Sequence, residues 1–208
     1  MISGIAILDE TLGDIRSGLL VIYGDAASGK TTLSLQYASS VLKAKGRVLF
    51  ISTENELFIE RIPYMVNDIN LLEQFDILAI RDFRVQNLVT FNILIKPQLL
   101  ERYHLLIIDS LTALYRLAFY ENKRALNMLN MQFAILSKIA SSIPVIATSQ
   151  VRGGEEGFEI LARSLVRYWA DYIIKLEIIE KGIRRLTIEK PTGKYKVLDL
   201  AMTKEGLK

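Results

Sequence analysis

One short segment of the chain has the residues that bind the phosphates of a nucleotide. Residues 24–31 read Gly-Asp-Ala-Ala-Ser-Gly-Lys-Thr and match the pattern G-x-x-x-x-G-K-[ST] in full. The glycines let the backbone bend so that its N–H groups point at phosphate oxygens, and the following helix adds the positive end of its dipole. Lys30 is expected to neutralise the β- and γ-phosphates, and the Thr31 hydroxyl to bind Mg²⁺. The predicted contacts of ATP in this loop are Gly24, Asp25, Ala26, Ala27, Ser28, Gly29, Lys30, Thr31 and Thr32.

Two carboxylates downstream could complete a hydrolytic site. Residues 105–109 read Leu-Leu-Ile-Ile-Asp, an apolar strand that ends in a carboxylate, and Asp109 is expected to hold the water shell of Mg²⁺. Glu54 follows another predicted strand, and ligands of such sheets lie at the carboxyl ends of the strands. Glu54 could therefore activate the water that attacks the γ-phosphate. From spacing alone, a helix-capping or surface carboxylate is an equally good interpretation of Glu54.

The elements that must position these residues alternate in type. Apolar runs that predict strands alternate with helical patterns, an order typical of a parallel sheet wrapped by helices. Beyond residue 171, apolar and polar residues alternate, and turns at Lys181-Gly182 and Thr192-Gly193 separate the segments, which indicates antiparallel strands on one edge. The predicted fold is an α/β, three-layer α/β/α P-loop NTPase with a mainly parallel sheet. Strands are predicted over 19–23, 47–52, 75–80, 105–109, 144–148, 172–179, 183–189 and 195–201, and helices over 30–42, 56–67 and 124–141.

Length and composition restrict the remaining possibilities. The chain has 208 residues, which suits one domain over 1–208, and 50% of them are hydrophobic, which argues against disorder. With no Cys and one His, thiolate sites are excluded and a His-cluster zinc site is not expected. No segment is long and apolar enough to span a bilayer, and residues 1–4 do not resemble a secretory signal, so a cytoplasmic protein without a membrane partner is expected. The net charge of +3 permits a nucleic-acid partner without arguing for one.

In this order, the motifs resemble the ATPase core of the RecA/RadA recombinase family over nearly the whole chain. Residues 50–55, Phe-Ile-Ser-Thr-Glu-Asn, are similar to the stretch that carries the family's catalytic glutamate. The resemblance therefore favours Glu54 as the general base. Arg61 falls where archaeal and eukaryotic members place an arginine against adenine.

Two further segments are similar to conserved elements of that family. Residues 109–116 resemble its extended Walker B segment, and residues 148–151 resemble the element that senses the γ-phosphate. The resemblance implies a RecA-like ATPase core with ATP and Mg²⁺ as cofactors. It assigns Gln150 as the phosphate sensor, beside Lys30 and Glu54 in catalysis.

The closest resemblance is to the short archaeal RadA paralogues of the RadB kind, which are thought to assist the recombinase. RadA-type recombinases carry an N-terminal helical DNA-binding domain and a linker motif that joins protomers. This chain starts directly at the core, at residues 3–9, so both are expected to be absent. The second DNA loop has only residues 152–159 available, and three glutamates there would repel phosphate. A recombinase or paralogue partner is expected and self-association is left open, whereas filament formation and autonomous strand exchange are not expected.

Several cations could contact DNA, with single-stranded DNA as the expected partner. The family's first DNA loop would lie within residues 116–130, and Arg163 and Arg167 share a face of a predicted helix because they are four residues apart. An ordinary solvated cation is the alternative for each. Lys190 and Lys194 could complete a neighbouring protomer's site in trans, or be exposed lysines of an ordinary hairpin. The predicted DNA-binding residues are Arg116, Lys123, Arg124, Arg152, Arg163 and Arg167.

The sequence thus predicts an ATP-binding protein, a weak ATPase stimulated by DNA, that acts as an accessory factor in homologous recombination and DNA repair. Two alternatives remain open. One is a KaiC-like signalling ATPase that does not act on DNA. The other is a module in which ATP only sets the shape presented to a recombinase partner.

Overall fold

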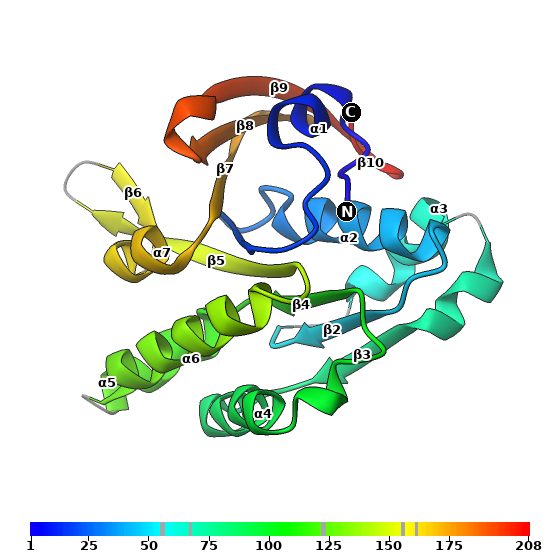
Figure 1. Ribbon diagram of the computed structural model, residues 1–208. Helices are drawn as coiled ribbons and strands as arrows, with labels where there is room; N and C mark the ends of the chain where they lie inside the picture. The colour runs from blue at the N-terminus through cyan, green and yellow to red at the C-terminus, as the bar shows by residue number, and fades with distance from the viewer. Residues whose placement is uncertain (55–56, 67, 122–123, 155–156, 161) are drawn as a thin grey trace.

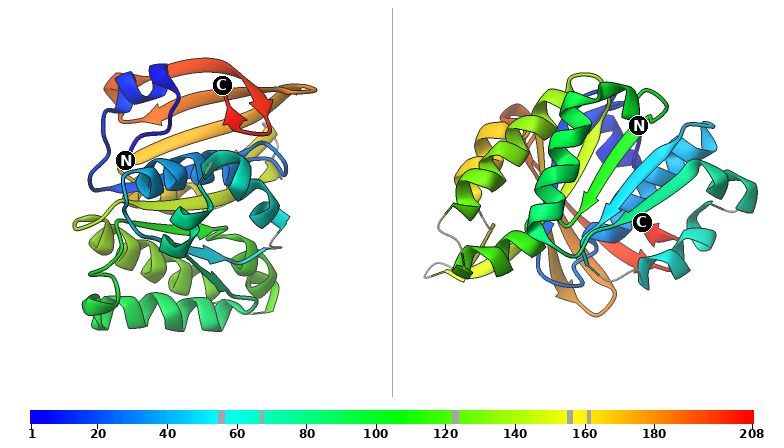
Figure 2. Two further views of the ribbon diagram at one scale, coloured as in Figure 1. Left: turned by 90° about the vertical axis from the view of Figure 1, so that its right-hand side faces the viewer. Right: turned by 90° about the horizontal axis from the view of Figure 1, so that it is seen from below.

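The structure, a computed structural model, describes the chain apart from residues 55–56, 67, 122–123, 155–156 and 161 (Figure 1). For residues 57–58, 120–121, 152–154 and 157–160 it describes the backbone only. Helices cover both faces of a central sheet, and Figure 2 shows α4 and α6 crossing the lower face. Among the described residues, no helix is both long and apolar enough to cross a bilayer.

The sheet has ten strands in the order β10-β9-β8-β7-β1-β5-β4-β2-β3, with β6 paired to β5. Neighbouring strands are parallel from β7 to β3 and antiparallel from β7 to β10. The predicted mainly parallel sheet with antiparallel C-terminal edge strands is therefore confirmed. The strands are β1 Leu19–Gly24, β2 Val48–Ser52, β3 Phe75–Ala79, β4 Leu105–Asp109, β5 Val145–Gly154, β6 Gly157–Ile160, β7 Tyr172–Glu180, β8 Ile183–Lys190, β9 Lys196–Thr203 and β10 Gly206–Leu207.

Two hydrophobic cores hold the helices to the sheet, one on each face. Helices α1, α2 and α3 pack on the first core, and α4, α5, α6 and α7 on the second. The α-helices are α1 Ala6–Leu12, α2 Lys30–Lys43, α3 Ile62–Val66, α4 Phe83–Ile95, α5 Ala113–Glu121, α6 Ala125–Ala140 and α7 Arg163–Trp169. Short 3-10 helices span Leu57–Arg61, Ile69–Gln74, Pro97–Leu99 and Thr192–Lys194.

The central strands are apolar on both faces because helices cover both. Every residue of β1 is buried, and so is every residue of β4. Side chains alternate between the two faces of a strand, so Leu20 and Ile22 contribute to the first core while Val21 contributes to the second. This burial explains why these strands are continuous apolar runs rather than alternating ones.

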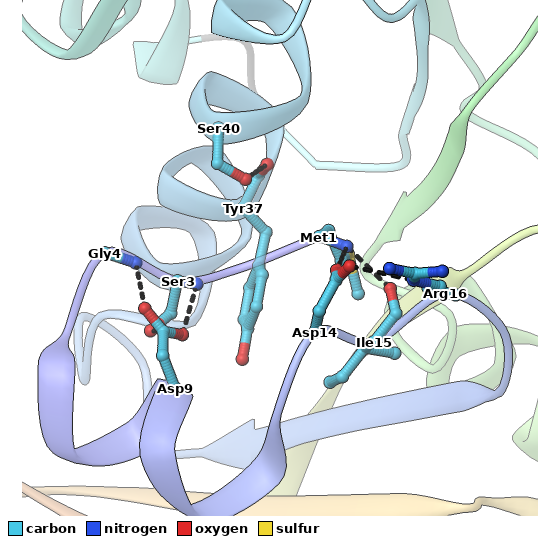
Figure 3. A network of polar contacts seen from close by, with 9 residues as sticks. All are labelled: Met1, Ser3, Gly4, Asp9, Asp14, Ile15, Arg16, Tyr37 and Ser40. Atoms are coloured by element: carbon cyan, nitrogen blue, oxygen red, sulfur yellow. Dashed lines mark hydrogen bonds and ion pairs between the residues drawn. The ribbon is translucent and has the colours of Figure 1, made fainter.

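The segment before β1 is fastened by the carboxylate of Asp9 (Figure 3). That carboxylate accepts hydrogen bonds from the backbone N–H of Ser3 at 2.6 Å, the Ser3 hydroxyl at 2.7 Å and the backbone N–H of Gly4 at 2.9 Å. Tyr37 of α2 lies beside this network in the first core, and its burial raises the pKa of the phenol. The segment therefore packs against α2 through both polar and apolar contacts.

The prediction of one continuous helix over 56–67 is wrong. The described part of this segment is the 3-10 helix Leu57–Arg61 followed by α3, which begins at Ile62. Pro63 lies in the first turn of α3, where the missing N–H of proline is tolerated. Proline in the interior of one long helix would remove a hydrogen bond and clash, so the segment divides here.

Both segments expected to be DNA loops are largely regular structure. Helix α5 extends to Glu121 and α6 begins at Ala125, so little of residues 116–130 is loop. Residues 152–154 and 157–159 lie in strands, since β5 continues to Gly154 and pairs with β6, where Val151 lies opposite Ile160. The expected positions of both DNA loops overlap regular structure because α5 was not among the predicted helices and β5 continues past its predicted end at residue 148.

Replacing Phe133 with alanine is expected to destabilise the protein by about 3–5 kcal/mol, because the change leaves a cavity in the second core. Phe133 of α6 is fully buried, with 0% of its surface exposed. Leu126 of the same helix is 42% exposed, so Leu126→Ala is the matched control and should cost under about 1 kcal/mol. Urea unfolding measures both. Equal losses in the two variants would contradict the placement of α6.

Candidate active site

The phosphate-binding motif forms the turn between β1 and α2. Gly24 has φ 154° and Gly29 has φ 106°, values that side-chain-bearing residues rarely adopt. A Cβ atom at Gly24 would lie 2.0 Å from the Leu176 carbonyl oxygen of the neighbouring strand β7. Glycine is therefore required at this position, and the turn is fixed by the sheet as well as by its own sequence.

Lys30, at the start of α2, folds back over the loop. Its Nζ donates to the Gly24 carbonyl at 3.0 Å and to the Asp25 carbonyl at 2.6 Å. Only 8% of the residue is exposed, and this burial lowers the pKa of the ammonium group although nearby carboxylates, Asp109 first, oppose the shift. A buried cation whose hydrogen bonds go to neutral carbonyls is suited to receive an anion. The phosphates of a nucleotide fit this requirement.

A hydrogen bond between Thr31 and Asp109 joins the phosphate loop to the end of β4. The Thr31 hydroxyl donates to Oδ2 of Asp109 at 2.6 Å, and the Thr148 hydroxyl of β5 donates to Oδ1 of the same carboxylate. Asp109 is 8% exposed, and burial raises its pKa despite these two hydrogen bonds. A hydroxyl and a carboxylate in contact are the oxygen ligands that Mg²⁺ prefers, so the predicted metal pair Thr31 and Asp109 fits the ion.

Two predicted catalytic residues contact each other across the sheet. Nε2 of Gln150 donates to Oε1 of Glu54 at 2.7 Å. Gln150 lies in β5, and Glu54 follows β2 at the same edge of the sheet. Oε1 of Gln150 is buried and has no hydrogen-bond partner among the described residues. The pair therefore presents the Glu54 carboxylate, which is exposed and can accept hydrogen bonds from water, and leaves the amide oxygen of Gln150 in the interior unsatisfied by the described residues.

Arg61 lies beside the first turn of α2. Its Nη1 donates to the Thr32 hydroxyl at 2.7 Å, and its Nη2 donates to the Thr203 carbonyl of β9 at 3.3 Å. The guanidinium therefore sits between the phosphate loop and the antiparallel edge of the sheet. This position is compatible with the contact to adenine that the sequence predicts.

The sequence interpretation missed one cation at the phosphate loop. Nη2 of Arg184, near the start of β8, donates to the Ala27 carbonyl at 3.2 Å. No local pattern marks this residue, because the hairpin of β7 and β8 reaches the loop only through the pairing of β7 with β1. The adjacent arginine, Arg185, instead pairs with Asp199 at 2.7 Å.

The predicted DNA-binding residues lie on several elements at one side of the molecule. Arg163 and Arg167 are exposed on α7, Arg116 is exposed on α5, and Arg124 is exposed just before α6. Figure 1 and the right panel of Figure 2 place α7, the hairpin of β5 and β6, and the junction of α5 and α6 on the same side. The backbone of Arg152 lies in β5, and Lys123 is outside the described residues.

Lys190 and Lys194 are considered as residues that reach a neighbouring protomer's site, and Lys190 forms hydrogen bonds within this chain. Nζ of Lys190 donates to the Ala170 carbonyl and, at 3.4 Å, to the Arg167 carbonyl, both at the end of α7. Lys194 is exposed in the 3-10 turn before β9. Lys190 thus stabilises the helix that carries two of the predicted DNA contacts.

Comparisons with known proteins agree with this geometry. A family model described as the AAA domain matches residues 19–132. The DNA repair and recombination protein RadB of Methanococcus maripaludis strain C7 is 34% identical over 193 residues, 88% of this chain and 87% of that protein. RadB of Methanocaldococcus jannaschii is 32% identical over 188 residues, 86% of this chain and 87% of that protein. A solved structure described as the crystal structure of the RadB recombinase matches with a TM-score of 0.74 and 26% identity, covering 99% of this chain and 97% of that one.

The matches extend over both the phosphate loop and the strands that carry the carboxylates. The loop, Thr31, Asp109, Glu54 and Gln150 gather at the carboxyl ends of parallel strands, where such sheets bind their ligands. The chain therefore belongs to the RadB family of DNA repair and recombination proteins, a group of RecA-like P-loop ATPases.

Proposed function

We propose that this protein hydrolyses ATP slowly, that single-stranded DNA accelerates the reaction, and that it serves as an accessory factor to a recombinase. The observation that carries the proposal is that two hydrogen-bonded pairs of side chains lie at the carboxyl ends of the parallel strands. Thr31 contacts Asp109 beside the loop, and Gln150 contacts Glu54 two strands away. The names of the relatives support the role in repair and recombination.

Each residue has a distinct task in the proposed reaction. Lys30 leaves its carbonyl partners to bind the β- and γ-phosphates, and Arg61 contacts the adenine. Thr31 and Asp109 hold Mg²⁺, which supplies positive charge to the phosphate oxygens when it is bound. Glu54 accepts the proton of the attacking water, because its carboxylate lies at the carboxyl end of β2.

Gln150 is proposed to report the γ-phosphate to the DNA-binding side. Its side chain bonds to Glu54, and its backbone continues through β5 into the hairpin with β6. A γ-phosphate that draws the amide away from Glu54 would therefore pull on this hairpin. The proposed DNA contacts are Arg116, Lys123, Arg124, Arg152, Arg163 and Arg167.

Steady-state ATP hydrolysis, with and without single-stranded DNA, tests the proposal. We expect a low basal rate with Mg²⁺ and an increase when DNA is added. A measurable rate that ignores DNA would remove the DNA part and favour a signalling ATPase. Binding of ATP without any turnover would instead favour a module whose shape ATP sets for a recombinase partner.

The double variant Arg163→Ala/Arg167→Ala is expected to weaken binding of single-stranded DNA. Each lost phosphate contact should reduce the slope of log K against log salt by about 0.7. Lys43→Ala/Lys204→Ala makes the same change in charge at two exposed residues, one at the end of α2 and one in the turn between β9 and β10, so it is the matched control. Fluorescence anisotropy at several salt concentrations measures both. An equal loss in the two double variants would show that only net charge matters.

A further inference from the structure

The ladders that join β4 to its two neighbouring strands end at the residues that the site needs. The ladder between β2 and β4 ends where Ser52 lies opposite Asp109, and that between β4 and β5 ends where Ile108 lies opposite Ala147. Glu54 and Gln150 both lie beyond these last pairs. Gln150 also pairs with Gly24 of β1, but contacts beyond the two ladders of β4 must link Glu54 and Gln150 to the turn that follows Asp109.

Between β2 and β4, the connection is made by Thr53. Its backbone N–H donates to the Asp109 carbonyl at 2.9 Å, and its hydroxyl donates to the Ser110 carbonyl at 2.6 Å. The Ser110 N–H donates back to the same hydroxyl at 2.9 Å. Thr53 is 4% exposed, so all of these bonds are shielded from water. Thr53, the residue that immediately precedes Glu54, is thus bonded to both polar groups of the peptide between Asp109 and Ser110 and to the carbonyl of the next peptide.

Between β4 and β5, the connection is made by Thr112. Its hydroxyl accepts the backbone N–H of Gln150 at 3.1 Å and shares a hydrogen bond with the Ser149 hydroxyl at 3.2 Å. The Ser149 hydroxyl in turn reaches the Gln150 carbonyl at 3.4 Å. Thr112 is 0% exposed and Ser149 is 1% exposed. These contacts account for both the acceptor and the donor capacity of the Thr112 hydroxyl, with the proton directed to Ser149.

We infer that Thr53 and Thr112 are positioning residues for ATP hydrolysis. Their hydroxyls hold Glu54 and Gln150 at fixed places on either side of the turn that follows Asp109, so they act through these two residues. The inference rests on the proposed roles of Glu54 and Gln150. Proton transfer to Glu54 requires the water, the base and the phosphate to be aligned within a fraction of an ångström. The hydrogen bonds of these two hydroxyls lie beyond the ends of the β2–β4 and β4–β5 ladders and supply that alignment.

Valine is the matched replacement, because it keeps the shape of threonine and removes the hydroxyl. We expect Thr53→Val and Thr112→Val each to lower kcat roughly 10- to 100-fold, with the KM for ATP changed by less than about 3-fold. Thr112→Ser keeps the hydroxyl and should restore most of kcat. Thr90→Val is the control, since Thr90 is 1% exposed and its hydroxyl donates at 2.8 Å to the Gln86 carbonyl within α4. All rates are measured at a temperature where every variant is folded.

The same assay includes Glu54→Gln, so that two kinds of failure are separated. If Glu54→Gln abolishes turnover but both valine variants of the site retain the wild-type kcat, the inference is overturned and the proposed function stands. A fall in kcat that Thr90→Val shares, or that Thr112→Ser does not reverse, also overturns it, because the effect is then one of general stability. If Glu54→Gln leaves turnover unchanged, the proposed base fails, and the positioning roles fail with it.

Discussion

Glu54→Gln is expected to lower kcat for ATP hydrolysis by about 10²- to 10⁴-fold while leaving the affinity for ATP nearly unchanged. Glutamine keeps an oxygen that can accept the hydrogen bond from Nε2 of Gln150, which spans 2.7 Å in the wild-type protein. It cannot take a proton from water, so the change removes general-base catalysis and little else. Steady-state kinetics measure the rate, and calorimetric titration with ATP measures binding.

Glu60→Gln is the matched control, since Glu60 is an exposed carboxylate in the neighbouring 3-10 helix. Its rate should stay within about 2-fold of wild type. A Glu54→Gln variant with the same rate as this control would establish the other interpretation of Glu54, a surface carboxylate without a chemical role. Loss of ATP binding in Glu54→Gln would point to a structural defect rather than to a missing base.

Asp109→Asn is expected to raise the stability of the nucleotide-free protein and to abolish turnover that depends on Mg²⁺. Burial raises the pKa of Asp109 above the ordinary value of 3.8, so the folded state disfavours the ionised carboxylate. The wild-type protein therefore loses stability, relative to the variant, as the pH rises from about 3.8 through the raised pKa. At neutral pH the variant should therefore melt at a higher temperature than the wild-type protein.

Asp199→Asn is the control, and it should lower the stability of the protein rather than raise it. The hydrogen bonds from Arg185 lower the pKa of this exposed carboxylate, so its ionised form contributes stability that is lost at acid pH. Thermal melts at pH 4, 6 and 8 compare the two variants. A drop in the melting temperature of Asp109→Asn at pH 8 would show that its hydrogen bonds with Thr31 and Thr148 outweigh the burial of charge. Turnover with Mg²⁺ that survives the substitution would argue against Asp109 as a metal ligand.

The local features of the site could be predicted from the sequence because they are contiguous. Strand β4 has the predicted ends, Leu105 and Asp109, and the phosphate loop lies between a strand and a helix as expected. A run of apolar residues and a fixed motif depend on neighbours a few positions away. Their physical requirements can therefore be read from one stretch of chain.

Contacts between residues far apart in the sequence could not be predicted from a single stretch of chain. The bond between Gln150 and Glu54 joins residues 96 positions apart, and Arg184 meets Ala27 across 157 positions. Both depend on the order of strands in the sheet, which periodicity does not encode. The ladder of β5 and β6 escaped prediction for a related reason. Its strands pair with each other through the backbone, and glycines and glutamates give no alternating apolar pattern.

The order of the strands also governs how the protein must fold as it is made. Strand β1 comes first along the printed sequence, yet it lies between β5 and β7, with Leu19 opposite Val145 and Leu20 opposite Tyr172. During synthesis its apolar residues emerge from the ribosome long before either partner strand exists, whereas β2 can already pair with β3. Non-local pairing of this kind makes folding slow and exposes apolar strands to aggregation. The phosphate loop at the end of β1 therefore takes shape only after most of the chain has been made.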